Sequence, residues 1–559
     1  MAIQIKAFAN SDDALIVWRP KPWNDQWVGF ALWRRDDKTQ TVTAVNNRIP
    51  ASRKSKSLPD AGISSALSPI RRLMWVDHGV NDGDRVSYRV VPMIEQGGGY
   101  LADEPSASPW SAGVEASGAA GEHAYAVFNR GTLMSQVVSR FLKGEITVAN
   151  LKKFKNNLAN AGNIPRRYLS GQLRHRLMRF LGDAEARGSE IFAALYEVND
   201  EELIGALKAF GNRGHVLLGN GSSMKKNLNA ELKTAGLEIK RRDLSKKGAS
   251  SPSVHNKFLV EVPPGAGPAR VLTGSTNWTT TGLCTQLNNA IIVDDAAIAA
   301  RFHEQWKLLV KAGDNMPASL KAKNAVITQA ANGEAYFCAT AGEADLAPVT
   351  AVIDGAEQGL FYLMYTPGQS PILNALLDKS QGPVGPYVRG VISEVRESAT
   401  GKIVENNVRV VRKGEEETFR ETALLPSGVP KPKTNVPSWA KEEIARKMFF
   451  PAGMNAIVHS KVIVADPFSE NCAVVAGSHN FSTSASAKND ENVVIVRGNR
   501  RLALLYALHI QSVYDHYAWR AFLNSGGEPD KVFDGLVRWK PGGAKHRDVD
   551  FWLDGHVTG

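Results

Sequence analysis

The first 114 residues carry short hydrophobic runs in which apolar and polar positions alternate. These runs are IQIKAF, ALIVW, WVGFALWRR, TQTVTAV, LMWV and RVSYRVVPMI, and clusters of Asp, Asn, Gly and Pro separate them. Alternation with a period of two between turn residues predicts short antiparallel strands. We therefore expect an all-β sandwich over residues 1–114, followed by a small, Gly/Ala-rich linker over residues 115–122.

After the linker, strand-like runs alternate with amphipathic helical patterns. One helix is predicted over residues 164–184, where the large apolar side chains on one helical face are Leu169, Leu173, Leu177 and Phe180. This alternation indicates an α/β layer architecture. Near residue 331 the order of elements starts again. We therefore expect two related α/β halves, over residues 123–330 and 331–525, and a C-terminal extension over residues 526–559.

The composition is that of an ordinary globular protein. Of 559 residues, 43% are apolar and 22% are charged, which leaves ample material for buried cores and excludes intrinsic disorder as the main state. At ~150 residues per domain, the length predicts roughly three or four globular units. The formal net charge of +11 favours anionic partners, and phospholipid head groups and nucleic acid both fit.

The three cysteines predict neither a disulfide framework nor a zinc site. Cys284, Cys338 and Cys472 lie in separate, mostly apolar surroundings and show no paired spacing. We expect each of them to be a small buried apolar residue in a reducing compartment.

The chain shows no targeting or membrane-spanning pattern. The stretch MAIQIKAFANSDDALIV has no basic region followed by an apolar one, and no uncharged apolar run approaches the ~20 residues that span a bilayer. We therefore expect a protein that is soluble and cytoplasmic as synthesised. Export by a route that needs no cleavable signal is kept as an alternative.

Three segments of the chain occur twice. The first copy has HNKFLV from His255, GSTN from Gly274 and QLNN ending at Asn289; the second has HSKVIV from His459, GSHN from Gly477 and NDEN ending at Asn492. Matching positions are separated by 203 or 204 residues. An H-x-K tripeptide alone is weak, but three segments that agree at a constant separation indicate an internal duplication.

The spacing within each copy suits a phosphate group. His and Lys are two residues apart on a predicted strand, so both side chains point to one face. An imidazole and an ammonium on one face favour an anion. The Gly-Ser that follows lets backbone and hydroxyl approach that anion, and the Asn amide supplies another donor.

Two such histidines can transfer a phosphoryl group. A neutral imidazole attacks phosphorus in line, and the opposite imidazolium protonates the leaving alkoxide. The lysines and amides offset the charge on the equatorial oxygens, a role that magnesium has in other phosphoryl-transfer enzymes. No carboxylate cluster accompanies the motifs, so we expect no catalytic metal and no cofactor.

With these motifs the chain resembles the phospholipase D superfamily, whose signature is H-x-K-x4-D followed by G-S-x-N, present twice. The resemblance covers residues 123–525. It implies two α/β halves related by a pseudo-two-fold axis, one active site between them, and a metal-independent mechanism through a covalent phosphohistidine. The N-terminal unit, with Trp18, Tyr88 and a closing Trp110, resembles a fibronectin type III module.

The resemblance also implies roles for individual residues. His255 and His459 are the nucleophile and the general acid/base. The residues that bind the phosphoryl oxygens are Lys257, Lys461, Asn277 and Asn480, with Ser275 and Ser478 nearby.

The two copies differ at the motif's aspartate and in the third segment. The second copy has Asp466, whereas the first has Val262 at that position. Some branches of the superfamily, the tyrosyl-DNA phosphodiesterases for example, also lack this aspartate, so the site need not be inactive. Glu491 stands where the first copy has Asn288, and a carboxylate there can orient an imidazole through its second ring nitrogen.

The choice of nucleophile depends on these differences. Family custom makes His255 the nucleophile. Glu491 argues the other way if it orients His459, because a carboxylate makes an imidazole more basic. We expect His255 to be the nucleophile and His459 the acid.

Basic residues form three clusters, and the second half carries an insertion. The clusters are Lys152, Lys153 and Lys155; Arg166, Arg167, Arg174, Arg176 and Arg179; and Lys240, Arg241, Arg242, Lys246 and Lys247. We expect mostly solvated helix faces, although the last cluster, just before the first motif, could steer an anionic substrate. We interpret the insertion, over residues 398–454, as a surface excursion, with a lid or acyl-chain rest as the alternative.

Three functions fit these features. The leading hypothesis is a phosphodiesterase that hydrolyses, or transfers, the head group of a phospholipid, with peripheral contact to a membrane. The alternative is a nuclease or DNA-end-processing enzyme with the same chemistry, whose binding falls steeply with salt. The third is a catalytically weakened binding or scaffold protein, suggested by Val262 and by the β-sandwich. We expect a monomer, and the β-sandwich could bind an unknown partner or only its own catalytic part.

Overall fold

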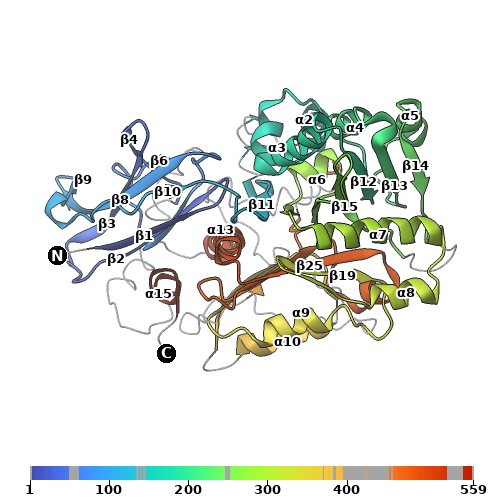
Figure 1. The fold of residues 1–559 in the computed structure, drawn as a ribbon. Coiled ribbons are helices and arrows are strands. Elements are labelled where there is room, and N and C mark those ends of the chain that lie inside the picture. Colours follow the sequence, from blue (N-terminus) through green and yellow to red (C-terminus); the bar gives the residue numbers. More distant parts are fainter. Residues whose placement is uncertain are drawn as a thin grey trace.

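The computed structural model of the chain consists of an all-β unit beside a larger α/β body (Figure 1). The described residues are 3–49, 62–133, 137–138, 141–142, 147–245, 252–368, 370–381, 385–393, 423–424, 452–454, 457–525 and 546–556. Lys246, Lys247, most of the insertion and most of the C-terminal extension lie outside them. Among the described helices, none has the length and apolar character that crossing a bilayer requires.

The N-terminal unit is built from antiparallel sheets. One sheet contains β1 (Gln4–Ala9), β2 (Ala14–Arg19) and β7 (Met74–Asp77). The other contains β10 (Val114–Glu115), β8 (Arg85–Gln96), β3 (Trp27–Asp36) and β4 (Val42–Ala44), with β9 (Gly99–Ala102) paired to β8. A separate pair joins β5 (Asn46–Asn47) to β6 (Ile63–Ser64). Trp18 and Phe30, from different sheets, pack with ring centroids 5.7 Å apart and are fully buried, as a sandwich core requires.

The first α/β half is built on a mixed sheet. In spatial order its strands are β11 (Ala124–Phe128), β17 (Asn289–Val293), β16 (Arg270–Gly274), β15 (Lys257–Val262), β12 (Glu190–Leu195), β13 (Gly214–Leu218) and β14 (Glu238–Arg241). Its helices are α2 (Val148–Leu158), α3 (Ile164–Ala186), α4 (Glu201–Lys208), α5 (Leu228–Thr234), α6 (Thr280–Cys284), α7 (Ala296–Ala312) and α8 (Ala318–Asn324).

The second half repeats this order of strands. Its sheet contains β18 (Thr328–Ala330), β19 (Gly333–Cys338), β25 (Glu491–Arg497), β24 (Ala473–Gly477), β23 (Val462–Ala465), β20 (Gly359–Met364), β21 (Tyr387–Ile392) and β22 (Ala423–Leu424). Its helices are α9 (Ala347–Asp354), α10 (Pro371–Gln381), α12 (Thr483–Lys488) and α13 (Arg500–Ser525); α15 (Arg547–Asp554) follows near the C-terminus.

The strand orders match position by position from β11 and β19 onward. In each half the motif strand, β15 or β23, pairs antiparallel with the strand next to it on the sheet, β12 or β20. The next two strands in each half are parallel. The predicted α/β body with two related halves behind an all-β unit is therefore confirmed.

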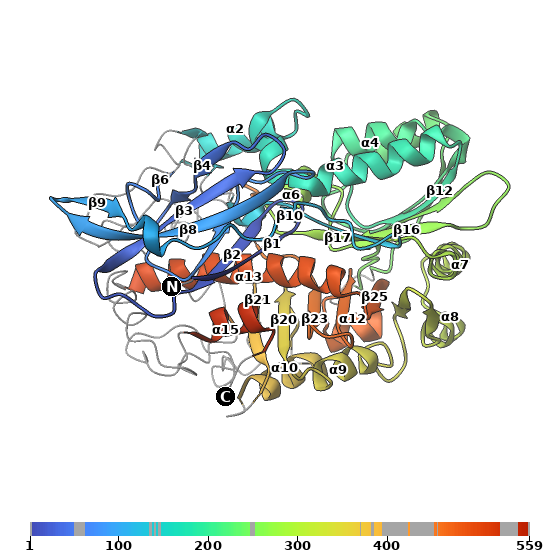
Figure 2. The same cartoon turned by 60° about the vertical axis from the view of Figure 1, so that its left-hand side comes forward.

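The two large sheets share one apolar layer. Figure 2 shows α3 and α4 on the outer side of the first half and α9 and α10 on the outer side of the second. Its side chains from the two halves include Phe258, Val260, Ile291, Phe361, Val464 and Val494. The other face of the first sheet packs on α2 to α6, and the other face of the second sheet packs on α9 and α10. Helices α7 and α13, which follow the last strand of each half, contact both sheets. The two halves therefore form one body with the ends of both motif strands at their junction.

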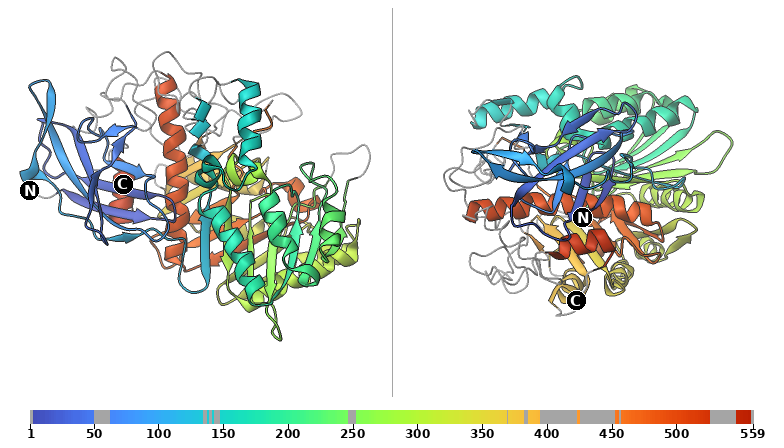
Figure 3. Two further views of the ribbon diagram at one scale, coloured as in Figure 1. Left: turned by 90° about the horizontal axis from the view of Figure 1, so that it is seen from above. Right: turned by 90° about the vertical axis from the view of Figure 1, so that its left-hand side faces the viewer.

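The β-sandwich packs against this body, and Figure 3 shows α13 running between the two. The Asp12 carboxylate lies 3.4 Å from the Arg130 guanidinium and accepts the backbone N–H of Gln172 at 3.3 Å. That contact falls at a kink in α3, where Gly171 has φ 49° and a side chain would meet Asp12 at 3.0 Å. The sandwich thus contacts the α/β body of its own chain.

Candidate active site

The two predicted histidines face each other across the junction of the halves. His255 lies two residues before β15 and His459 three residues before β23, and their ring centroids are 6.4 Å apart. Both are buried, with exposed fractions of 7% and 5%. The backbone of each contacts the opposite half. The backbone N–H of His255 donates to the Asp490 carbonyl, and the backbone N–H of His459 donates to the Leu287 carbonyl, both at 2.9 Å. The backbone of each half therefore positions the histidine of the other.

The two lysines lie beside the histidines, but the predicted placement of both residues on one strand does not hold, because β15 begins at Lys257 and β23 at Val462. The Lys257 ammonium donates to the His255 carbonyl at 2.7 Å, and the Lys461 ammonium donates to the His459 carbonyl at 2.5 Å. Each is buried. The structure therefore brings two imidazoles and two ammonium groups together between the halves, an arrangement suited to a phosphoryl group.

The carboxylate of Glu491 supports His255 and not His459. His255 Nδ1 lies 2.9 Å from Glu491 Oε2, and His459 Nδ1 lies 2.9 Å from Asn288 Oδ1. The Asn288 amide is oriented by its Nδ2, which donates to the Gly282 carbonyl at 2.8 Å, so its oxygen is the atom that faces His459. The interpretation that Glu491 orients His459 is thus wrong, because the third segment of each half crosses to the opposite histidine.

These contacts define the ring tautomers. Glu491 Oε2 and Asn288 Oδ1 are both acceptors, so both histidines carry a proton on Nδ1. Nε2 of each ring is then the nitrogen without a proton in the neutral imidazole.

Burial dominates the electrostatics of the site. It lowers the pKa of His255 to about 4, although Glu491 acts in the opposite direction. Burial and the neighbouring Lys461 and Lys257 bring the pKa of His459 well below its ordinary value. Burial also lowers the pKa of Lys257 to about 7. An anion between these groups raises all of these pKa values, because it favours the charged form of each.

Glu491 is the fixed negative charge of this group. Burial alone raises the pKa of a carboxyl, but His255 outweighs that effect and the pKa of Glu491 falls to about 2. Its other oxygen accepts from Asn489 Nδ2 at 2.9 Å. The half that contains Asn288 has no such charge at the matching position.

The two motif serines form hydrogen bonds with residues of the third segments, QLNN and NDEN. Ser275 Oγ donates to Asn288 Oδ1 at 2.7 Å, and Ser478 Oγ accepts the backbone N–H of Asn492 at 3.1 Å. Both hydroxyls are buried and satisfied by these contacts. They hold the residues that support the histidines, and a direct contact with phosphate stays a prediction.

The two motif asparagines differ in their partners. Asn277 Nδ2 donates to Glu197 Oε2 at 2.8 Å. The Oδ1 atoms of Asn277 and Asn480 are buried and have no hydrogen-bond partner among the described residues. Both amide oxygens can thus still accept a hydrogen bond from another molecule, whereas a phosphoryl oxygen would need the amide N–H groups.

The motif's aspartate lies at the far end of its strand. Asp466 follows β23, whereas His459 precedes it, and its carboxylate accepts the backbone N–H groups of Gln358 and Gly359 at 2.7 and 2.8 Å. It therefore holds the loop that enters β20. Val262 ends β15 in the same way, so its lack of a carboxylate removes no contact at the histidines.

Sequence reasoning missed a tyrosine in each half. Tyr196 packs on His255 with ring centroids 4.8 Å apart, and Tyr365 packs on His459 at 5.1 Å. The Lys257 and Lys461 ammonium groups lie 4.9 and 5.2 Å from the centroids of the same two rings. Each tyrosine comes directly after the corresponding strand, β12 or β20, so a comparison of the two halves at strand ends could have found both.

Two arginines of the basic clusters are buried in ion pairs. Arg242 has no exposed surface, and its guanidinium contacts both carboxylate oxygens of Asp490 at 2.6 and 3.1 Å. Arg166 pairs with Asp200 at 2.8 Å in the same bidentate way. The expectation of solvated faces is therefore wrong for these two residues, because each balances a buried carboxylate.

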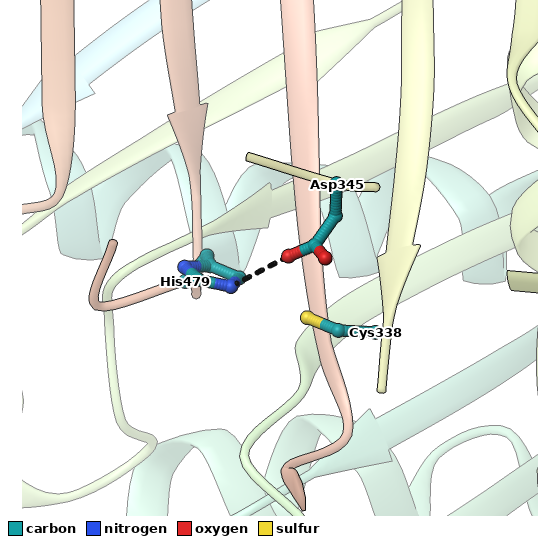
Figure 4. A group of neighbouring side chains, drawn as sticks. All are labelled: Cys338, Asp345 and His479. Atoms are coloured by element: carbon teal, nitrogen blue, oxygen red, sulfur yellow. Dashed lines mark ion pairs between the residues drawn. The ribbon is translucent and has the colours of Figure 1, made fainter. Parts of the chain in front are cut away.

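A further polar group lies inside the second half (Figure 4). Cys338, Asp345 and His479 are buried, and among the described residues they are a group whose ligand atoms are close enough to hold a metal ion. However, His479 Nδ1 accepts the backbone N–H of Phe481 at 2.7 Å. The ring proton then lies on Nε2, which faces Asp345 and so has no lone pair for a metal.

Comparison with known proteins agrees with this architecture. A family model described as the PLD-like domain of cardiolipin synthase matches residues 177–309 and 349–513, together more than half of the chain. No curated protein sequence matches the chain.

Comparison with solved structures gives matches at low identity and low TM-score. Phosphatidylserine synthase from Haemophilus influenzae has a TM-score of 0.37 and 12% identity, over 62% of this chain and 84% of its own. Polyphosphate kinase from Porphyromonas gingivalis has a TM-score of 0.35 and 13% identity, over 57% of this chain. The chain spans only 42% of that kinase's length. Yeast tyrosyl-DNA phosphodiesterase has a TM-score of 0.29 and 10% identity, over 56% of this chain and 85% of its own.

Proposed function

The chain belongs to the phospholipase D superfamily, and from this premise we propose that it is a metal-independent phosphodiesterase that works through a covalent phosphohistidine. The observation that carries the proposal is the pair of opposed imidazoles, His255 and His459, 6.4 Å apart and each oriented through Nδ1. Attack and departure take place on opposite sides of phosphorus, so an in-line reaction needs one such group on each side.

In the first step, His255 Nε2 attacks phosphorus and forms the N–P bond. The P–O bond to the alcohol breaks, and the leaving oxygen takes the proton of His459 Nε2. The new phosphoimidazolium is positive, and Glu491, 2.9 Å from Nδ1 of the same ring, stabilises it. His459 has only the neutral Asn288 amide behind it, so its imidazolium gives up a proton more readily. This asymmetry supports His255 as the nucleophile and His459 as the acid.

In the second step, His459 acts as a base. Its neutral Nε2 takes a proton from water or an alcohol, whose oxygen attacks phosphorus while the N–P bond breaks. His255 is then neutral and His459 is protonated, as at the start. Lys257, Lys461 and the amides of Asn277 and Asn480 offset the charge on the equatorial oxygens in both steps.

A phospholipid head-group bond is the substrate that we propose. The matching family model is described by cardiolipin synthase, a name that refers to a phospholipid. A polynucleotide needs a continuous row of available cations. Arg166 and Arg242 are buried in ion pairs, and Arg174 and Arg176 contact Glu202 and Asp82. This leaves fewer charges for a nucleic-acid backbone than the sequence clusters suggest.

A parallel assay tests the proposal. The full chain is incubated with vesicles of phosphatidylcholine, phosphatidylethanolamine or phosphatidylglycerol, and with single- and double-stranded DNA, with and without EDTA. Head-group release that persists in EDTA and is lost in His459→Ala supports the proposal. The exposed His175 serves as the matched control, because His175→Ala removes an imidazole far from the motifs in sequence. Cleavage of DNA without lipid turnover contradicts the substrate, and loss of activity in EDTA contradicts the metal-free mechanism.

Trapping the intermediate tests the assignment of roles. We expect acid quench of a reaction with phosphorus-labelled lipid to leave label on His255. Label on His459 would reverse the roles of the two histidines.

A further inference from the structure

The two halves hold their motif asparagines by different means. In the first half, Glu197 supports Asn277 with its side chain and with its backbone. Glu197 Oε2 accepts from Asn277 Nδ2 at 2.8 Å, and the Glu197 carbonyl accepts the N–H of Trp278, the next residue, at 2.9 Å. The asparagine is therefore tied at its amide and at the peptide that follows it.

The second half has no carboxylate at the corresponding place. Tyr365 matches Tyr196 because each directly follows its strand, so Thr366 stands where the first half has Glu197. The Thr366 hydroxyl is buried and has no hydrogen-bond partner among the described residues. Asn480 therefore needs another support.

His479 supplies that support from the variable position of G-S-x-N. Its Nδ1 accepts the N–H of Phe481 at 2.7 Å, and Phe481 has φ 55°, a conformation that costs free energy for a residue with a side chain. The His479 ring thus links the residue before Asn480 to the residue after it. In the first half the same position is Thr276, whose hydroxyl donates to the Asn289 carbonyl instead.

Asp345 holds the ring in place (Figure 4). Its Oδ2 lies 2.9 Å from His479 Nε2, and its Oδ1 accepts from Thr340 Oγ1 at 2.5 Å and from the Ser486 hydroxyl. Asp345 and His479 are 3% and 1% exposed. The carboxylate is thereby tied to the end of β19, to α12 and to the motif loop at once.

We propose that Asp345 and His479 are positioning residues that hold Asn480 in the geometry for binding a phosphoryl oxygen. In the second half the pair provides one of the two contacts that Glu197 makes in the first, the one to the N–H that follows the asparagine. It touches no substrate, and it acts through the peptide between Asn480 and Phe481. This inference rests on the proposed function, since that function gives Asn480 its role.

Two substitutions distinguish the contribution of the Nδ1 contact of His479 from that of its Nε2 contact. Asn places an oxygen near the position of Nδ1, so His479→Asn can still accept the Phe481 N–H, as in an Asx turn. Gln places an amide near the position of Nε2, so His479→Gln can still reach Asp345 but leaves the Phe481 N–H without its acceptor. Both remove the imidazole and are buried at the same site, so a general loss of packing affects them alike.

The full chain carrying each substitution is assayed for hydrolysis of bis(p-nitrophenyl) phosphate and for binding of inorganic phosphate by calorimetry. We expect His479→Gln to lower kcat/KM about 100-fold, the usual cost of a displaced reacting partner, and to weaken phosphate binding. His479→Asn should stay within about tenfold of the native chain and bind phosphate more tightly than His479→Gln. Thr276→Val, at the matching position of the first half, is the control variant for a lost buried hydrogen bond.

Three results overturn the proposal. The first is an equal loss of kcat/KM in the two His479 variants, and the second is a smaller loss of kcat/KM in His479→Gln than in His479→Asn. The third is a stoichiometric metal ion that mass spectrometry detects in the native chain and in neither variant. The binding measurement keeps the two proposals apart. If the native chain hydrolyses no phosphodiester but His479→Gln alone weakens phosphate binding, the proposed function fails and the positioning role stands. If hydrolysis is present but the two variants behave alike, the positioning role fails and the proposed function stands.

Discussion

Glu491 Oε2 lies 2.9 Å from His255 Nδ1, although the two residues belong to different halves and are 236 positions apart in the chain. The matching contact in the other direction, from Asn288 to His459, has the same length but no charge. The active site is therefore symmetric in geometry and asymmetric in electrostatics.

Glu491→Gln should lower kcat by about 100-fold with a much smaller change in KM. Gln keeps an acceptor for His255 Nδ1 but removes the charge that stabilises the phosphoimidazolium, which forms only after binding. Steady-state kinetics on a soluble phosphodiester measures the effect. The control is Glu470→Gln, which removes an exposed carboxylate paired with Arg500. An unchanged kcat would contradict the role of Glu491.

Asn288→Asp should move the alkaline limb of the kcat/KM profile to higher pH by about one unit. A carboxylate beside Nδ1 favours the imidazolium of His459, so the pKa of that ring rises. A general acid is active only while protonated, so activity then persists to higher pH. The profile from pH 5 to 9 is compared with that of the exposed control Asn157→Asp. A shift of the alkaline limb to lower pH, or none, would argue against His459 as the acid.

Arg242→Met should destabilise the chain by about 3–5 kcal/mol, because it leaves the Asp490 carboxylate buried without its partner. The double variant Arg242→Met/Asp490→Leu should recover most of this loss, since an apolar pair replaces the ions. Urea denaturation followed by tryptophan fluorescence measures both. Lys225→Met breaks a partly exposed pair with Glu201 and should cost less than about 1 kcal/mol. A double variant that is less stable than Arg242→Met would contradict this account.

His509 should make the fold less stable in mild acid. Burial lowers its pKa from 6.5 to about 4, with Asp13 acting against that shift, and its ring stacks on Phe128 at 4.1 Å. The unfolded chain therefore binds a proton more tightly, and the stability tied to neutral His509 is lost as pH falls from 6.5 toward 4. Between pH 7 and 4.5 the free energy of unfolding should fall less in His509→Phe than in the native chain, by about 2–3 kcal/mol. Equal losses in urea denaturation would exclude His509 as the cause.

Local pattern predicted the elements of this fold well. The helix over residues 164–184 is α3, and Leu169, Leu173, Leu177 and Phe180 are all buried on it. The kink at Gly171 was not predicted, because it depends on Asp12 from the β-sandwich. Periodicity reports which face of an element is apolar, but it does not report which distant loop packs against it.

The basic clusters illustrate the same limit. Arg241 and Arg242 are neighbours in the sequence, yet Arg241 is exposed and Arg242 has no exposed surface. What distinguishes them is the set of partners around Arg242: the Asp490 carboxylate on the other half and the carbonyls of Gly313 and Asn315. A cluster of charges in sequence therefore predicts neither a binding face nor the number of free cations on it.

By itself the sequence determined the duplication and the residue types of the candidate site. Two H-x-K and two G-S-x-N segments at a constant separation specify two histidines, two lysines and two asparagines, because strand period and residue type are local properties. The tertiary structure alone decided which carboxyl or amide serves which histidine. Glu491 and Asn288 each cross to the opposite half, since Asp490 and Leu287 pair their backbone with His255 and His459. That exchange is a contact between the halves, and no spacing along one chain segment encodes it.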